Sequence, residues 1–322
     1  METILKYQAR SRDWIEARGP DSLRFLNGMW TADFSRATRV GGLVSGGALL
    51  LSVKGKLVSP AVFVGFDPNH FVFSLPAGAG DGALKSMESL LVADDVDLKL
   101  FKSGQGGPFG SVLSFPLGAS TEENMNNQNW IQHDVPGAQD LLARVSKTDS
   151  GLWINRGKLS QSHVELWIES GKNFSAKDSQ SLTSEEYFEL RFRSGVPEWG
   201  VDWAFDSMPL EFPVQEVISF HKGCYVGQEV VARATFRGKM VRSFCRFEAL
   251  AGQMLKADFV YLEGQSDPPV GKITSFLGSK ALGLIRLSAL DAGKALVQRV
   301  SAENSQELGP LKVSIIEGIK AH

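Results

Sequence analysis

Three apolar runs between residues 48 and 75 are joined by turns of only three residues. The runs cover 48–53, 57–66 and 70–75, and the turns read Lys54-Gly55-Lys56 and Asp67-Pro68-Asn69. Parallel neighbouring strands need a crossover of about a dozen residues or more, so connections this short require antiparallel hairpins. The sequence therefore predicts an antiparallel meander in this part of the chain.

A second group of short strand-like runs, separated by Gly and Pro, follows residue 240. It comprises 243–247, 259–262, 270–276, 281–286 and 311–316. This spacing predicts a small β-barrel or sandwich and a domain boundary near Met240, which gives domains 1–240 and 241–322. Upstream, Thr183 and Glu186 have capping-box spacing, which predicts a helix that ends before Gly195 and Pro197. Helices with antiparallel strands indicate the α+β class.

Two further segments predict helix ends. Asp21 can accept bonds from the first-turn amides of a helix over 22–28, and Gly28 suits a left-handed exit from it. The Gly-rich run 78–83 lies between a strand and a predicted helix over 83–92, the context of a dinucleotide-binding fingerprint. Because the preceding strands are hairpin-linked rather than part of a parallel βαβ unit, we interpret this run as a strand-to-helix turn.

Charge and cysteine content narrow the classes of function. The formal net charge of -2 gives no general attraction for nucleic acid, so no direct nucleic-acid partner is expected. The two cysteines, Cys224 and Cys245, cannot build a disulfide framework or a four-thiolate metal site. No apolar run reaches the ~20 residues that span a bilayer. We expect a cytoplasmic protein without a membrane or metal site.

The segment Lys222-Gly223-Cys224-Tyr225-Val226-Gly227-Gln228-Glu229 is the strongest functional candidate. Its last three residues predict the start of a helix, so Cys224 precedes a helix N-terminus and lies near Lys222. Both features favour the thiolate and indicate a reactive cysteine. The alternative is a small buried cysteine in a glycine-shaped turn. His221 and Cys224 could form a thiol–imidazole pair or bind one metal ion. Because the sequence shows no further ligand and no orienting partner, we interpret His221 as a turn residue.

A basic cluster follows this octet. No acidic residue lies between Glu229 and Glu248, whereas the interval holds Arg233, Arg237, Lys239, Arg242 and Arg246. Scattered surface charges are the simpler explanation. A local cationic strip on a slightly acidic protein also suits a small polyanion, to which it offers a few phosphate- or carboxylate-sized contacts.

The octet, followed by Val231-Ala232-Arg233, resembles the signature of the YgfZ family, which is related to the folate-dependent glycine-cleavage T-protein. Weaker similarity covers most of the chain, including 19–33, 53–57, 190–197 and 270–275. The resemblance implies a three-lobed α+β fold around a folate-sized hole, with antiparallel sheets in two interleaved lobes over 1–240 and a C-terminal β-barrel over 241–322.

The resemblance also implies a function and its site. It implies a tetrahydrofolate-binding accessory protein for iron–sulfur enzymes, including tRNA-modifying ones, with Cys224 essential and its pKa lowered by Lys222. Folate or polyglutamyl folate and iron–sulfur proteins are the implied partners. The implied folate contacts are Asp33, Arg191, Tyr225, Gln228, Glu229, Arg233 and Arg242. Arg193 stands where relatives carry a pterin-binding glutamate, and an arginine cannot accept the hydrogen bonds that the pterin donates.

Two competing functions stay open. A folate-dependent aminomethyl or methyl transferase needs a carboxylate near the folate nitrogen, for which Asp33 and Glu229 are candidates by position in the sequence. Either carboxylate can instead cap a helix. A pure interaction scaffold is the other alternative, and the arginine at position 193 is compatible with it.

Overall fold

The computed structural model is described in two compact units, each treated by itself. The first unit comprises Met1–Leu182 and Glu216–Gln228, and the second comprises Thr183–Gln215 and Glu229–His322. The residues that the structure describes are 5–35, 43–116, 145–148, 151–155, 163–172, 179–214, 217–236, 238, 240–250, 259–264, 268–299 and 307–316.

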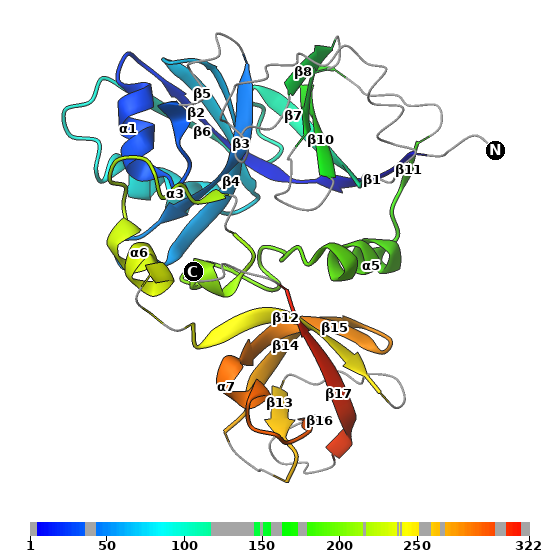
Figure 1. The fold of residues 1–322 in the computed structure, drawn as a ribbon. Helices are drawn as coiled ribbons and strands as arrows, with labels where there is room; N and C mark the ends of the chain where they lie inside the picture. The colour runs from blue at the N-terminus through cyan, green and yellow to red at the C-terminus, as the bar shows by residue number, and fades with distance from the viewer. Residues whose placement is uncertain are drawn as a thin grey trace. The chain divides into compact units, whose positions relative to one another are not determined.

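The predicted meander lies in a five-stranded antiparallel sheet of the first unit (Figure 1). In spatial order its strands are β3 (Val44–Leu51), β4 (Leu57–Asp67), β5 (His70–Pro76), β2 (Arg12–Arg18) and β6 (Asp97–Phe101). The two short turns join β3 to β4 and β4 to β5 as antiparallel pairs, which confirms the meander. Although β3 is an edge strand, all of its residues are buried, so other chain segments cover it.

A second, six-stranded sheet completes the first unit. Its strands, in spatial order, are β11 (Ser179–Ser181), β1 (Leu5–Arg10), β7 (Phe109–Pro116), β10 (His163–Glu169), β9 (Gly151–Asn155) and β8 (Val145–Thr148). Only the β1–β11 pair among these is parallel. Aromatic side chains from both sheets form one core, in which Trp14 of β2 contacts Phe109 and Trp167 with ring centroids 5.3 and 5.0 Å apart.

The Gly-rich run is a structural turn, in agreement with our interpretation. Asp13 of β2 accepts hydrogen bonds from the amides of Gly78 (2.8 Å) and Gly80 (2.9 Å) through one carboxylate oxygen and from Ser103 (3.0 Å) through the other. The amides that a phosphate would use are therefore occupied by a buried carboxylate. Helix α3 (Gly80–Glu88) begins earlier than predicted, at the amides that Asp13 accepts.

Helix α1 (Ser22–Met29) corrects two predicted details. Asp21 precedes the helix, but its side chain makes no capping hydrogen bond. Gly28 is not a left-handed exit, because the helix continues to Met29 and its C-cap Trp30 is extended. The carbonyl of Gly28 accepts a hydrogen bond from the amide of Val226.

The second unit contains the remaining helices and a closed barrel. Helix α5 (Ser184–Ser194) confirms the capping box, with Thr183 and Glu186 bonded reciprocally and Gly195 left-handed at its end. A short 3-10 helix η2 (Pro209–Glu211) follows, and α6 (Gln228–Phe236) confirms the predicted helix start after Gly227. Lys280 bonds Glu189 at 2.8 Å and lies over Phe192, which joins α5 to the barrel.

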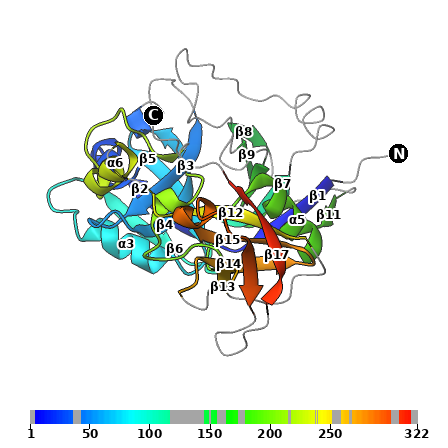
Figure 2. The same cartoon turned by 60° about the horizontal axis from the view of Figure 1, so that its bottom comes forward.

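The barrel confirms the predicted C-terminal architecture. Its cyclic order is β12 (Arg242–Ala249), β15 (Lys280–Arg286), β14 (Gly271–Leu277), β13 (Phe259–Leu262), β16 (Leu296–Arg299) and β17 (Glu307–Ile315), with α7 (Leu287–Leu290) after β15. Figure 2 shows β12, β15 and β14 side by side. The α+β class with antiparallel sheets is thus confirmed. The division at residue 240 stays a prediction; the barrel strands begin at Arg242, and the second unit also includes α5 and η2.

Candidate functional site

The octet forms the loop that leads into α6, and its cysteine is accessible. Cys224 and its neighbour Gly223 are exposed, and a Cβ built at Gly223 meets no atom of the described residues within 4 Å. The alternative of a small buried cysteine therefore does not describe Cys224. It describes Cys245, which lies in the barrel core, where burial raises the pKa of its thiol.

Thr31 connects the chain before this loop to the edge of the five-stranded sheet. Its amide donates to the carbonyl of Leu49 in β3, and its hydroxyl accepts from the amide of Leu49 at 2.8 Å. The same hydroxyl donates to the carbonyl of Val217 at 2.6 Å, while the Thr31 carbonyl accepts from Ser219. These bonds use the free edge of β3 and explain why that strand is buried.

Lys222 fixes the loop to the C-terminal end of α1. Its ammonium donates to the carbonyls of Asn27 at 2.9 Å, Ala32 at 2.6 Å and Trp30. The last carbonyls of a helix lack partners within the helix and carry partial negative charge, so a cation there completes their hydrogen bonding and is favoured by the helix dipole. Lys222 thus supplies the termination of α1 that we had assigned to Gly28.

The surroundings of the Lys222 ammonium are mostly uncharged. The nitrogen lies 4.8 Å from the ring centre of Tyr225 and 6.0 Å from that of Phe34. Burial lowers the pKa of Lys222 from its ordinary value to about 7, and the carboxylate of Asp33 opposes that shift. An ammonium offers three N–H donors for the three carbonyls, whereas a neutral amine offers two.

Two glycines let the loop pack closely on the same unit. The amide of Val226 donates to the carbonyl of Gly28 at 3.0 Å. Gly227 has a φ of +80°, and a side chain there would lie 2.6 Å from the carbonyl oxygen of Ser52 and 3.1 Å from the Cα of Gly55. Only glycine fits both the backbone geometry and the space. The loop is therefore held on two sides, at α1 and at the β3–β4 turn.

The predicted effect of Lys222 on the pKa of Cys224 stays a prediction. The contacts of the Lys222 ammonium are to backbone carbonyls and aromatic rings, and its nitrogen is partly buried whereas the thiol is exposed. The geometry supports an anchoring role for Lys222. Its partners are backbone atoms, which every residue type carries, so no side-chain pattern in the sequence could have indicated them.

The other predicted site residues of the first unit lie around the same loop. Asp33 accepts hydrogen bonds from the amide (3.0 Å) and hydroxyl (2.5 Å) of Ser35 and acts electrostatically on Lys222. The Gln228 side chain accepts from the amide of Tyr225 at 3.4 Å. Tyr225 is buried, which raises its pKa to about 12, and its hydroxyl has no hydrogen-bond partner among the described residues.

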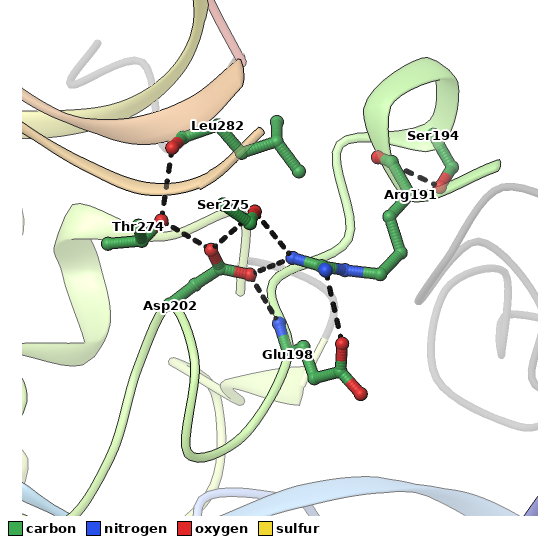
Figure 3. Close-up of polar contacts among 7 residues, drawn as sticks. All are labelled: Arg191, Ser194, Glu198, Asp202, Thr274, Ser275 and Leu282. Atoms are coloured by element: carbon green, nitrogen blue, oxygen red, sulfur yellow. Dashed lines mark hydrogen bonds and ion pairs between the residues drawn. The ribbon is translucent and has the colours of Figure 1, made fainter. Parts of the chain in front are cut away.

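Arg191, a predicted folate contact, lies instead within a polar cluster of the second unit (Figure 3). Its guanidinium is buried and pairs with the carboxylates of Asp202 and, at 3.1 Å, Glu198. Asp202 also accepts from the hydroxyl of Thr274 at 2.5 Å and from the amide of Glu198 at 2.7 Å, and Ser275 bridges the two charges. A β-bulge lies between Ile273 and Ser275 in β14.

The basic cluster is largely engaged within the second unit. Arg242 binds both carboxylate oxygens of Glu211, at 2.8 and 3.2 Å. Arg246 donates to the carbonyls of Phe192 and Arg193 and so caps the end of α5. Both side chains have protein partners, and their predicted contact with a polyanion stays a prediction.

The remaining members of the cluster and its neighbours are more exposed. Arg233 pairs with Glu229 at 3.3 Å in an exposed turn of α6. Arg193 is exposed, and its side chain lies 3.9 Å from that of Glu189. Arg237 and Lys239 lie outside the described residues.

Tetrahydrofolate fits these residues only in part. The buried Tyr225 hydroxyl has no hydrogen-bond partner among the described residues, and a polar ligand could supply one. In contrast, Arg191 and Arg242 are committed to carboxylates, and Asp202 accepts bonds at both of its oxygens. Within the described part of the chain, no group of three or more His, Cys, Asp or Glu side chains could hold a metal ion. No helix of the described residues is long and apolar enough to cross a membrane.

The relatives found by comparison with known proteins are YgfZ and IBA57 proteins. The tRNA-modifying protein YgfZ of Serratia proteamaculans is 30% identical over 317 residues, which cover 95% of this chain and 92% of that protein. The mitochondrial iron–sulfur cluster assembly factor IBA57 homolog of Dictyostelium discoideum is 23% identical, covering 97% and 80%. The IBA57 homolog of Neurospora crassa is 24% identical over 71% of this chain, and the match spans half of that protein. No family model matches the chain.

A solved structure shares the fold. The glycine cleavage system aminomethyltransferase T of Bartonella henselae superposes with a TM-score of 0.71 over 98% of this chain and 86% of that one. The sequences are only 12% identical, so the likeness concerns the fold alone. The T-protein-like α+β arrangement predicted from the octet is confirmed.

Proposed function

This chain belongs to the YgfZ family, and from that membership we propose that it is an accessory protein for iron–sulfur enzymes, including enzymes that modify tRNA, with Cys224 as its essential side chain. The names of its relatives support the two parts of this role, since they describe a tRNA-modifying protein and an iron–sulfur cluster assembly factor. The observation that carries the proposal is an exposed thiol on a loop that is bonded to the end of α1 and packed against the β3–β4 turn.

The anchoring explains how such a thiol can act on a large partner. Protein iron–sulfur clusters are held by cysteine thiolates, and the thiolate is the form of cysteine that binds metal or attacks sulfur. Loops lose entropy when a partner orders them. Thr31, Lys222 and Gly227 fix this loop before binding, so Cys224 is presented to a client without that cost.

Complementation tests the role of the thiol. A strain that lacks its own family member should regain tRNA methylthiolation with the wild-type chain and lose it with Cys224→Ser. Cys245→Ala is the matched control, because it removes the other, buried thiol and leaves Cys224 in place. Full rescue by a folded Cys224→Ser protein would show that the thiol is dispensable.

We also propose tetrahydrofolate, or its polyglutamyl form, as a ligand of Asp33, Tyr225 and Gln228 in the first unit. The buried Tyr225 hydroxyl supports this proposal. Because that hydroxyl has no partner among the described residues, Tyr225→Phe should leave the stability of the free protein unchanged or higher and weaken folate binding. Titration calorimetry measures the affinity of tetrahydrofolate and of its polyglutamyl form. No binding at millimolar tetrahydrofolate would favour the scaffold alternative.

No specific observation favours the transferase alternative. Glu229 is exposed and paired with Arg233, while Asp33 accepts bonds from Ser35, as a local turn would require. Turnover of an amine donor with tetrahydrofolate, abolished by Asp33→Asn, would revive that alternative. The predicted cytoplasmic location remains part of the proposal, and the IBA57 relatives are named as mitochondrial.

A further inference from the structure

The β3–β4 turn, Ser52–Lys56, is a rigid projection beside the octet. The amide of Ser52 donates to the carbonyl of Lys56 at 2.8 Å, and that of Gly55 donates to the carbonyl of Ser52 at 2.8 Å. The Ser52 hydroxyl accepts from the amide of Lys56 at 3.2 Å, and Gly55 is left-handed. At the tip, Val53 is 76% exposed. Because the turn is internally bonded, this exposure is a fixed feature of its shape.

The turn carries two cations that have no ion-pair partner among the described residues. Lys54 is exposed and Lys56 partly exposed, and neither ammonium has an ion pair among the described residues. Lys102, another exposed lysine of the same unit, instead pairs with Asp81 at 2.8 Å. An unpaired, partly dehydrated cation beside an apolar tip is a feature that a partner can use.

The turn is close to the thiol. Gly227 packs against Ser52 and Gly55, since a Cβ built on it would lie 2.6 Å from the Ser52 carbonyl oxygen and 3.1 Å from the Gly55 Cα, and Cys224 lies three positions before it in the chain. Three residues span at most about 11 Å when fully extended. The Debye length is about 10 Å at 0.1 M salt, which is a comparable distance, so we expect the lysine charges to act at low salt on a group that approaches Cys224.

The other charges at the loop leave this field positive. Lys222 carries an ammonium on the inner side, and Asp33 is the carboxylate that acts on it. His221 is exposed at the start of the loop. At the far end, Glu229 is exposed and paired with Arg233. Among the described residues of the turn and the loop, the cations without an ion-pair partner in the turn are Lys54 and Lys56.

We propose that the turn Ser52–Lys56 and the loop from His221 to Gly227 form one docking surface for an acidic segment of a partner protein, which Lys54 and Lys56 steer to Cys224. The inference rests on the proposed function and names the chemistry of the partner for that thiol. A protein segment suits the surface better than nucleic acid, because Val53 offers an apolar contact and the cationic area is small.

Charged disulfide probes test the steering directly. The Cys224 thiolate attacks either probe, forms a mixed disulfide and releases one aromatic thiolate. We expect the dianionic 5,5′-dithiobis(2-nitrobenzoate) to be favoured over neutral 4,4′-dithiodipyridine at low salt, and the preference should shrink at high salt. Reversing both charges with Lys54→Glu and Lys56→Glu should lower the anionic-to-neutral rate ratio about three- to tenfold.

Two matched variants separate charge from structure. Lys54→Arg with Lys56→Arg should keep the ratio, and Lys85→Glu, an exposed reversal on α3, should leave it unchanged. The rate with the neutral probe reports whether the loop is intact in each variant. An unchanged ratio in the double reversal, with an intact neutral rate, overturns the proposal.

Cellular rescue and tRNA binding complete the test. The double glutamate variant should lose rescue of tRNA methylthiolation and the double arginine variant should keep it. If tRNA binds the wild type but not the glutamate variant, nucleic acid is the occupant and the proposal is wrong. Rescue by Cys224→Ser would refute the proposed function, whereas the probe ratio decides the steering independently.

Discussion

Lys222 in the first unit and Arg191 in the second are both cations that are largely withdrawn from solvent, and their partners differ. Lys222 of the first unit donates to three backbone carbonyls, and the carboxylate that acts on it, Asp33, is not among those acceptors. Arg191 of the second unit pairs with the two carboxylates of Glu198 and Asp202 and with the hydroxyl of Ser275. Neutral dipoles surround one cation, and ionised groups surround the other.

This difference determines which of the two cations can lose its proton near neutral pH. Carbonyl dipoles compensate only part of the desolvation of an ammonium, so burial lowers the pKa of Lys222 to about 7. A guanidinium stays charged at any physiological pH, and its carboxylates hold it in place. The loop with Cys224 is thus tied by a titratable contact, whereas the cluster beside α5 is a fixed structural element.

The largest effect is expected from breaking the carboxylate-paired cation. Arg191→Ala leaves the buried carboxylate of Asp202 without its charge partner, and removing one member of a buried pair costs about 3–5 kcal/mol. Urea denaturation followed by fluorescence measures the free energy of unfolding of the second unit. Arg193→Ala on the same helix is the control, because its side chain is exposed and should change stability by less than about 0.5 kcal/mol. Equal losses in the two variants would contradict the comparison.

A neutral anchor of the same loop should give an intermediate effect. Thr31→Val keeps the side-chain shape but removes the hydroxyl that accepts from Leu49 and donates to Val217. Buried groups left without partners cost about 1–3 kcal/mol. The loss should be the same at pH 7 and pH 9, since no titrating group is removed. Faster alkylation of Cys224 by iodoacetamide would report the loosened loop. Ser86→Ala, which removes a partly exposed hydroxyl on α3, serves as the control.

Local patterns explain what could be predicted from the sequence. The hairpins of the meander, the capping box at Thr183 and the barrel strands depend on neighbours within a few residues, and all are confirmed. The exposure of Cys224 agrees with its predicted place before a helix start and not with the buried alternative.

Tertiary partners explain what could not. Lys222 bonds backbone carbonyls almost 200 positions away in the chain, and any residue type could have supplied those oxygens. Gly28 looked like a helix end because glycine commonly serves there, but a distant lysine performs that task. Arg191 and Arg242 were predicted to bind folate, and their carboxylate partners became apparent only after folding brought Asp202 and Glu211 to them.

The smallest change in the free energy of unfolding near pH 7 is expected for a substitution of Lys222. The sign of its pH dependence is what makes this substitution diagnostic. With its folded-state pKa lowered to about 7 and an unfolded value near 10.5, the unfolded chain binds more protons than the folded one between these limits. The free energy of unfolding of the wild type should therefore rise with pH across this window, by at most about 1.4 kcal/mol per pH unit from this group. Lys222→Met removes that rise. The free energy of unfolding of the variant should therefore lie nearest that of the wild type at pH 7 and fall furthest below it at pH 9. Near pH 7 its net change is small, because the lost hydrogen bonds are offset by removing a poorly solvated cation. Parallel stability curves for the two proteins between pH 7 and pH 9 would mean that the carbonyls and Asp33 keep the ammonium charged, and the contrast with Arg191 would then disappear.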